Sequence, residues 1–439
     1  MTPAVLAALV AVAGFGFASV VTWRLASLTG LRLGHPGVAF LVTHGVLFGA
    51  GGVVLALADS RPAPAAYTGA AMVAFGLGLA GSGWLAARRG PAAPDGRRPA
   101  KAAPAGQATP TTRLLVVALL AGAAIGLLLP LVVRSGLPFL AGDITGARSE
   151  IAGLVIQPLR VAAPALAILL VLRARASDRR GRLLGLAVVS LIGTFELLLA
   201  SRYLIAELLV AVVLAWLLAG RTIRARTILV LGLAGLVTFG ALQLVRTYDQ
   251  ARGQELEFAA RRTVNRLVLV QPRTLDALMT TIPAEQPHFA GGTWVRRLTA
   301  ALGQEPAPNI GYWIYSRVVA APQATAGYAA PGLLGEAWAN LGWLGLALFG
   351  ALGVSVERLG ALLALRHSLE ADVAAGALVT LFVARTHALG LVGLAILLVL
   401  VTAWRLLAAP DTGLRRAIGQ TLRWRAPEPP LEGALAHQP

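Results

Sequence analysis

The chain has 439 residues, of which 57% are hydrophobic and 13% are charged, whereas roughly a quarter of the residues of soluble globular domains are charged. With a mean hydropathy of +0.72, this composition excludes a soluble enzyme, a disordered tail and a fibrous protein. Cysteine is absent, which excludes disulfides, thiolate metal sites and a cysteine nucleophile. The net charge of +18 comes almost wholly from arginine, and in a membrane protein such charge belongs to cytoplasmic loops and requires no nucleic-acid partner.

Apolar runs recur along the whole chain and predict an all-α, polytopic membrane protein with about eleven transmembrane helices, since one such helix needs about 20 mostly apolar residues. The first run lacks a basic n-region and a clear cleavage site, which favours a span over a removed signal peptide. The predicted spans are 3–22, 37–58, 66–87, 114–133, 151–172, 183–200, 203–219, 227–245, 332–352, 371–385 and 388–407.

Arginine placement predicts the sidedness of these spans. The segments 88–113, 173–182 and 220–226 are strongly basic, and short cytoplasmic loops carry an excess of lysine and arginine. The N-terminus is then outside, and residues 408–439 form a basic cytoplasmic tail. The Pro/Ala/Gly-rich composition of 88–113 predicts a flexible linker.

This topology divides the chain into four parts: spans one to eight in 1–245, a large extracytoplasmic loop in 246–330, spans nine to eleven in 331–407, and the tail in 408–439. The loop contains nine arginines, but long loops translocate despite their charge. A helix is predicted near 254–270, with one apolar and one polar face. The apolar face comprises Leu256, Ala260, Val264, Leu267 and Val268, and the polar face comprises Arg261, Arg262, Asn265 and Arg266.

Ionisable residues inside or beside the predicted spans converge on the outer third of the bilayer. Such groups are costly in lipid and usually mark function. They are Arg160, Glu196, Arg202, Glu207, Arg246, Glu336, Arg385 and His387. Arginines at one depth suit a multiply charged anion, such as a pyrophosphate presented by a lipid, because the planar guanidinium binds phosphate oxygens in a fork.

Two structural interpretations of this layer remain open. Arg160 can form an ion pair with Glu196 or Glu207 that holds helices together, and Arg202 and Arg246 can extend to the outer headgroups. Motifs of soluble enzymes do not compete with the membrane interpretation. The sequence has no P-loop, no HExxH, no Gly-x-Ser-x-Gly, no clustered His/Asp set and no outer Asp-x-Asp pair, so no metal and no cofactor are predicted.

Three motifs occur in order over residues 114–352. The first is 136–143 with Arg148 in an outer loop; the second is Ala200-Ser201-Arg202 between two tightly joined spans. The third is Phe289-Ala-Gly-Gly-Thr-Trp294, followed by Gly335-Glu336-x-x-x-Asn340-x-Gly342-x-x-Gly345 at the start of a span. Their order, the topology and the large outer loop resemble the bacterial O-antigen or oligosaccharide repeat-unit polymerases.

The resemblance implies a metal-independent, GT-C-like membrane glycosyltransferase in the cytoplasmic membrane, with its active site on the extracytoplasmic side. It would join undecaprenyl-pyrophosphate-linked oligosaccharides into O-antigen, capsule or exopolysaccharide. Besides these glycans and the lipid bilayer, the expected partners are chain-length regulator and flippase proteins. Two features depart from the family pattern: the stretch after Gly292 contains Trp-Val-Arg-Arg, and Trp338 stands where tyrosine is usual.

The resemblance also assigns roles to residues. Arg202 and, in second place, Arg148 and Arg246 would bind the donor pyrophosphate. Glu336 or His288 would orient or deprotonate the acceptor hydroxyl. The supporting residues are Arg160, Glu196, Glu207, Asn340, Arg385 and His387, of which His387 is a third candidate for the base.

Each assignment has a structural alternative. Glu336 can cap its helix, where an acid in the first turn is favoured by the helix dipole, and a loop histidine such as His288 can be a surface residue. Tyr312, Trp313 and Tyr315 can stack on sugar faces or form an interfacial aromatic belt.

Three other functions compete with the polymerase. A ligase-like enzyme would use the same donor but pass the glycan to a different acceptor. A transporter of lipid-linked glycans would need a polar path through the inner half of the membrane, where the predicted spans hold few charges. Internal inverted repeats would favour a transporter, and the sequence lacks them. A non-catalytic membrane scaffold would have no use for layered arginines.

Overall fold

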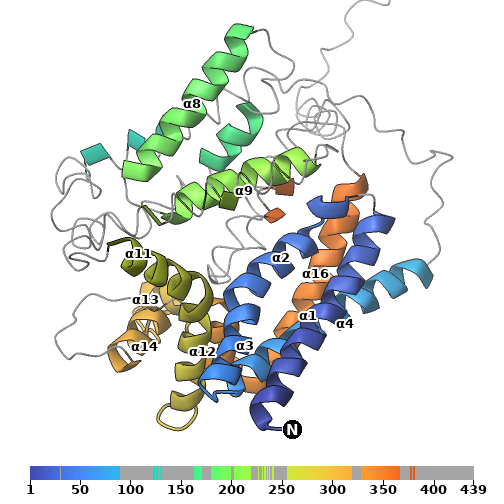
Figure 1. The fold of residues 1–439 in the computed structure, drawn as a ribbon, viewed down its shortest axis with the longest axis vertical. Coiled ribbons are helices and arrows are strands. Elements are labelled where there is room, and N and C mark those ends of the chain that lie inside the picture. The colour runs from blue at the N-terminus through green and yellow to red at the C-terminus, as the bar shows by residue number, and fades with distance from the viewer. Residues whose placement is uncertain are drawn as a thin grey trace, which may run out of the picture.

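The computed structural model describes residues 1–29, 31–88, 163–170, 179–198, 202–218, 255–318, 329 and 331–365, with isolated residues in 122–130, 226–241 and 376–380. Throughout these ranges the regular elements are helices, which confirms the all-α class (Figure 1). Four helical stretches within them are long and apolar enough to cross a membrane: Pro3–Leu28, Pro36–Ala58, Ala63–Leu85 and Gly332–Ala361. These four support a membrane protein, whereas the total of eleven spans stays a prediction.

The first three stretches match the first three predicted spans. They contain α1 (Pro3–Leu28), α2 (Pro36–His44), the π-helical turn η2 (Gly45–Ala50), α3 (Gly51–Ala58) and α4 (Ala63–Arg88). Helix α1 begins where Thr2 accepts a hydrogen bond from the Val5 N–H and proline occupies the first turn, a position where the missing proline N–H is not needed. His35 caps α2 in the same way by accepting from the Gly37 N–H at 3.1 Å.

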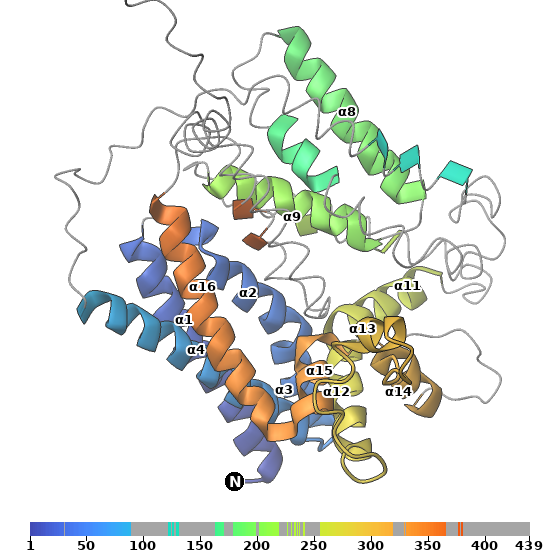
Figure 2. The same ribbon diagram turned by 180° about the vertical axis from the view of Figure 1, so that it is seen from behind.

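Glycines allow α4 to pack closely between α1 and α16 (Gly345–Leu365), as Figures 1 and 2 show. A Cβ built at Gly69 of α4 would lie 2.5 Å from the Val10 carbonyl oxygen, and one built at Gly78 would overlap the Gly350 carbonyl. Small residues bring helix backbones together in this way in membrane proteins. The contacts between α1 and α4 advance in the same direction along both helices, which are therefore parallel: Gly69 with Val10, Gly76 with Ala18 and Gly83 with Leu25.

The predicted span 332–352 is not one helix. It is divided into α15 (Gly332–Leu341), the 3-10 turn η4 (Gly342–Leu344) and α16. Gly342 has φ 57° and ψ −132°, and a Cβ built at Gly345 would lie 3.0 Å from the Ala337 carbonyl oxygen. Eight residues span about 12 Å along a continuous helix, so the chain folds back at Gly342. The α16 part alone, with 21 residues, is about 32 Å long.

The helix predicted near 254–270 exists, but its faces differ from the prediction. It is divided into α11 (Glu255–Val264) and the π-helical turn η3 (Asn265–Leu269). Val264, predicted to be on the apolar face, is 55% exposed, whereas Thr263 is buried and lies 3.9 Å from the Cβ position of Gly240. The π-turn shifts the register, and burial continues in α12 (Val270–Thr281) at Gln271, Leu275 and Leu278.

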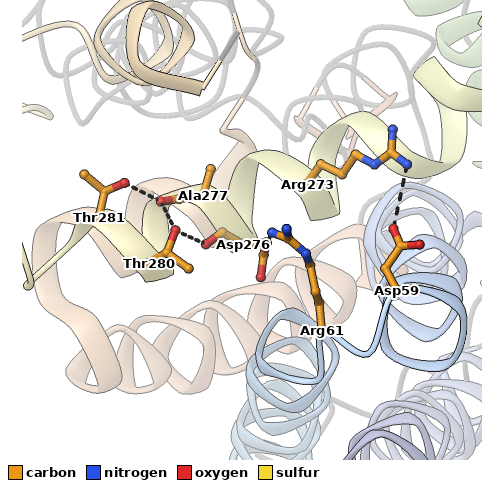
Figure 3. A network of polar contacts seen from close by, with 7 residues as sticks. All are labelled: Asp59, Arg61, Arg273, Asp276, Ala277, Thr280 and Thr281. Atoms are coloured by element: carbon orange, nitrogen blue, oxygen red, sulfur yellow. Dashed lines mark hydrogen bonds and ion pairs between the residues drawn. The ribbon is translucent and has the colours of Figure 1, made fainter. Parts of the chain in front are cut away.

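Two ion pairs of opposite sense attach α12 to the turn between α3 and α4 (Figure 3). Arg61 contacts the nearly buried carboxylate of Asp276, and Arg273 lies 3.8 Å from the Asp59 carboxylate. Residues 59–61 and α12 therefore lie at the same end of the helices. The predicted topology, which places both segments outside, stays a prediction.

The sixth and seventh predicted spans coincide with α8 (Arg179–Leu198) and α9 (Arg202–Leu218). Their strongly apolar parts, Leu186–Phe195 and Glu207–Leu218, are shorter than a full span. Of the span 151–172, residues 163–170 are described and helical. The spans 114–133, 227–245 and 371–385 are described at isolated positions, and 388–407 lies outside the described residues.

Candidate functional site

The two parts of the third sequence motif, some 40 residues apart in the chain, contact each other. The Phe289 N–H donates to the Ala339 carbonyl at 3.0 Å, and the Ala290 N–H donates to the Asn340 carbonyl at 2.9 Å. The last carbonyls of a helix have no partner within the helix, so this loop supplies hydrogen-bond donors to the C-terminal carbonyls of α15. Residues 289–294 are thereby held against the helix that carries Glu336.

Asn340 connects this loop to α15 through its side chain. Its Oδ1 accepts from the Thr293 N–H at 3.3 Å, and its Nδ2 donates to the Thr293 Oγ1 at 2.7 Å and to the Glu336 carbonyl at 2.8 Å. The residue is 1% exposed, and buried polar groups of this kind rigidify a structure when all of them are paired. Its predicted supporting role is compatible with this position.

The Glu336 side chain accepts a hydrogen bond from the Trp294 indole, with 3.1 Å between Nε1 and Oε2. Glu336 belongs to the second turn of α15, and Pro331 precedes the helix at the capping position. The carboxylate therefore meets a side chain of the loop and not the free N–H groups of the first turn. This geometry does not support the capping interpretation of Glu336.

His288 contacts a different part of α15. Its ring packs edge-to-face on Trp338, with 5.7 Å between centroids, and its Nε2 would lie 2.7 Å from a Cβ at Gly342. Its Nδ1 is buried without a hydrogen-bond partner. Positions 336 and 338 point about 200° apart on a helix, so His288 and Glu336 meet different faces of α15.

An aromatic cluster of Tyr67, Trp338 and Trp343 surrounds the break between α15 and α16. The Tyr67 ring lies edge-on to both indoles, with centroids 5.2 and 5.5 Å away, and Trp338 donates to the Ile282 carbonyl at 3.2 Å. Sequence reasoning did not find Tyr67. The available signal was a tyrosine inside an apolar span, since a buried phenol usually finds a hydrogen-bond partner.

The aromatic residues near the end of the loop belong to α14 (Ile310–Val318). Trp313 is half-buried and packs edge-to-face on Phe289, with 5.8 Å between centroids. Tyr312 is 56% exposed. Trp313 thus packs against the candidate site, whereas Tyr312 lies at the surface.

The arginines assigned to the pyrophosphate lie outside the described side chains. Arg202 is the first residue of α9 and Glu196 belongs to α8, but their side chains are outside the described set. Glu207 is buried, with 7% exposure. The predicted residues outside the described ranges are Arg148, Arg160, Arg246, Arg385 and His387.

Within the described ranges, no three His, Asp or Glu side chains are grouped to hold a metal ion. The chemistry visible in this part is one carboxylate held by an indole, a buried amide that joins two segments, and a histidine packed against aromatic rings. No family model, curated protein or solved structure matches this chain.

Proposed function

We propose that the chain is a membrane glycosyltransferase that polymerises lipid-linked oligosaccharide repeat units on the outer face of the cytoplasmic membrane. The observation that carries this proposal is the contact between residues 289–294 and α15. Both segments resemble motifs of one enzyme family, and the hydrogen bonds between them bring Glu336, Asn340 and Trp294 together.

In the proposed reaction, a sugar hydroxyl of one lipid-linked chain attacks the anomeric carbon of another. The new glycosidic bond forms as the bond from this carbon to the pyrophosphate oxygen breaks, and the electron pair leaves with the lipid pyrophosphate. Arg202, Arg148 and Arg246 are assigned to the developing negative charge, because preorganised cations stabilise such a leaving group. Glu336 is assigned to the acceptor hydroxyl, whose proton it takes.

Glu336 is favoured over His288 because of its surroundings. Its carboxylate has a defined hydrogen-bond donor in Trp294, whereas the His288 Nδ1 is buried without a hydrogen-bond partner and its ring packs on Trp338. A general base must reach the proton that it removes. His288→Asn is therefore expected to affect stability more than chemistry, and Glu336→Gln the reverse.

The test is polymerisation by purified protein in vesicles that contain undecaprenyl-pyrophosphate-linked repeat units, with the products separated as a ladder on a gel. Glu336→Gln should lower the rate by about 10²- to 10⁴-fold, as loss of a general base does. Glu257→Gln is the matched control, because Glu257 is an exposed member of a surface ion pair on α11. Arg202→Ala and Arg246→Ala should abolish the ladder, and lysine should rescue only in part because it lacks the fork.

Normal polymer length in both arginine variants would contradict the pyrophosphate assignment. A deletion strain separates the competing functions. Loss of chain length while single units are still made supports the polymerase, whereas long lipid-linked chains beside an undecorated acceptor support a ligase. Repeat units that accumulate on the cytoplasmic face would support a transporter.

A further inference from the structure

We infer that Trp294 is a positioning residue for the Glu336 carboxylate, which it holds in one orientation toward the acceptor hydroxyl. This inference rests on the proposed function and deepens it. Its basis is the bond from the Trp294 indole Nε1 to the Glu336 Oε2 at 3.1 Å, between residues 42 positions apart in the sequence. Because the bond engages Oε2, Oε1 is the oxygen assigned to the proton of the sugar hydroxyl.

The backbone before Trp294 is shaped to deliver the indole to this carboxylate. Ala290 and Gly291 have positive φ values of 49° and 87°, and the Gly292 and Trp294 N–H groups donate to the carbonyls of Phe289 and Gly291 at 2.8 and 3.0 Å. The chain thus makes two tight turns within six residues. Such turns favour residues that tolerate the left-handed region, which explains glycine at 291.

Three independent attachments fix this turn on α15 before the indole is considered. Two are the backbone bonds to the Ala339 and Asn340 carbonyls, and the third is the pair of bonds between the Asn340 amide and Thr293. Asn340 also bonds the Glu336 carbonyl one turn earlier. The carboxylate and its donor are therefore both held in place by the same turn of α15.

A merely structural tryptophan would need only its ring to fill space. The geometry assigns a function to the N–H itself. Other hydrogen bonds already hold the loop on this face of α15, so the bond from the indole to the carboxylate is not needed to attach the loop. A carboxylate with free rotation would present its oxygens to the substrate in many orientations, whereas a reacting group must be held in a productive geometry. Trp294, the first residue of the stretch that departs from the family pattern, thereby acquires a specific role in this chain.

The test compares variants that remove the N–H but keep an aromatic side chain, one with a smaller phenyl ring and one with a bicyclic ring of the same shape, in the same vesicle assay with intact protein. Trp294→Phe, and replacement of Trp294 by 3-benzothienylalanine, which substitutes sulfur for the N–H, should lower kcat by about 10- to 100-fold, as expected for loss of a hydrogen bond to a charged group. KM for the acceptor should change less than about twofold, because Trp294 binds the carboxylate and not the sugar. Trp23→Phe is the matched control, since Trp23 is a 58% exposed indole on α1.

A second readout does not depend on activity. In protein labelled with ¹⁵N-tryptophan, the Trp294 indole resonance, assigned through Trp294→Phe, should move in Glu336→Gln and stay in place in Glu257→Gln. Wild-type kcat in both Trp294 variants beside an inactive Glu336→Gln would overturn this inference alone, and so would an indole resonance unaffected by Glu336→Gln. Absence of polymer from the wild-type protein would instead overturn the proposed function.

Discussion

The hydroxyl of Tyr67 on α4 donates a hydrogen bond to the Gly342 carbonyl at 3.2 Å, at the point where the chain turns from α15 into α16. This bond joins a long apolar helix to the segment that carries the candidate site. Gly342 also contacts the His288 ring, so one glycine receives contacts from the helical bundle on one side and from the loop on the other. The backbone at Gly342 is therefore one of the points that fix α15, together with the bonds of Asn340 and Trp338.

Gly342→Ala is expected to destabilise the protein by about 1–3 kcal/mol, because φ 57° with ψ −132° is a backbone conformation that side chains strain. The new methyl group would also lie 2.7 Å from the His288 Nε2. His288→Ala should remove this overlap but leave the backbone strain, so the double variant should recover only part of the loss. Thermal unfolding of the detergent-solubilised protein measures both effects.

Gly81→Ala is the matched control for this prediction. Gly81 lies in α4, and nothing lies within 4 Å of its Cβ position. Alanine is favoured over glycine in helices by roughly 1 kcal/mol, so this change should leave the midpoint of unfolding unchanged or raise it. Equal destabilisation by the two substitutions would show that the conformation of Gly342 is not the cause.

The approximate positions of the first three helical stretches could be predicted from the sequence, whereas the end of α1 at Leu28 and the break at Gly342 could not. Apolar composition alone predicts a helix over 3–22. A glycine between apolar residues, however, is equally compatible with close helix packing, as at Gly78, and with a reversal, as at Gly342. The choice depends on contacts from Tyr67 and His288, which are distant in the chain.

The candidate site was predictable only in part for the same reason. Glu336 and Asn340 are spaced four residues apart on one helix, so their proximity follows from the sequence. The partners Thr293 and Trp294 come from a segment more than 40 residues earlier, and no periodicity relates the two segments. Both stretches resemble motifs of one family, but the hydrogen bond from the Trp294 indole to the Glu336 carboxylate could be found only from the folded structure.

Reversing the charges of Arg61 and Asp276 tests the attachment of α12. Each single reversal should place like charges together and destabilise the protein, whereas Arg61→Asp combined with Asp276→Arg should restore much of the loss. The coupling between the two positions should be measurable but small, since Arg61 is exposed and Asp276 is nearly buried. Additive effects of the two reversals in a double-mutant cycle would contradict a contribution of this pair. The exposed pair Arg261–Glu257 on α11 is the control and should show less coupling.

His35 should make stability depend on pH. Burial lowers the pKa of His35 to about 4, and the neutral ring accepts from the Gly37 N–H through Nδ1. Between pH 6.5 and 4 the unfolded chain binds a proton that the folded chain does not, so the free energy of unfolding falls as pH falls, by up to about 3 kcal/mol. His35→Asn keeps an acceptor but cannot titrate. The stability difference between the wild type and this variant should therefore shrink with acidification, and a constant difference from pH 7.5 to 4.5 would contradict the assignment.

The predicted sidedness can be tested directly, because the chain contains no cysteine and each introduced cysteine is then the only one. Arg61 and α12 lie at one end of the helices. Leu33, which is 41% exposed, precedes the 23-residue stretch Pro36–Ala58. This stretch separates Leu33 from Arg61 by about 34 Å. A membrane-impermeant maleimide added to intact cells should label Arg61→Cys and Glu285→Cys, and should label Leu33→Cys only after permeabilisation. Labelling of all three from outside would show that Pro36–Ala58 does not cross the membrane. Labelling of Leu33→Cys alone would invert the topology and place α15 with Glu336 on the cytoplasmic side, where a donor presented outside cannot reach it.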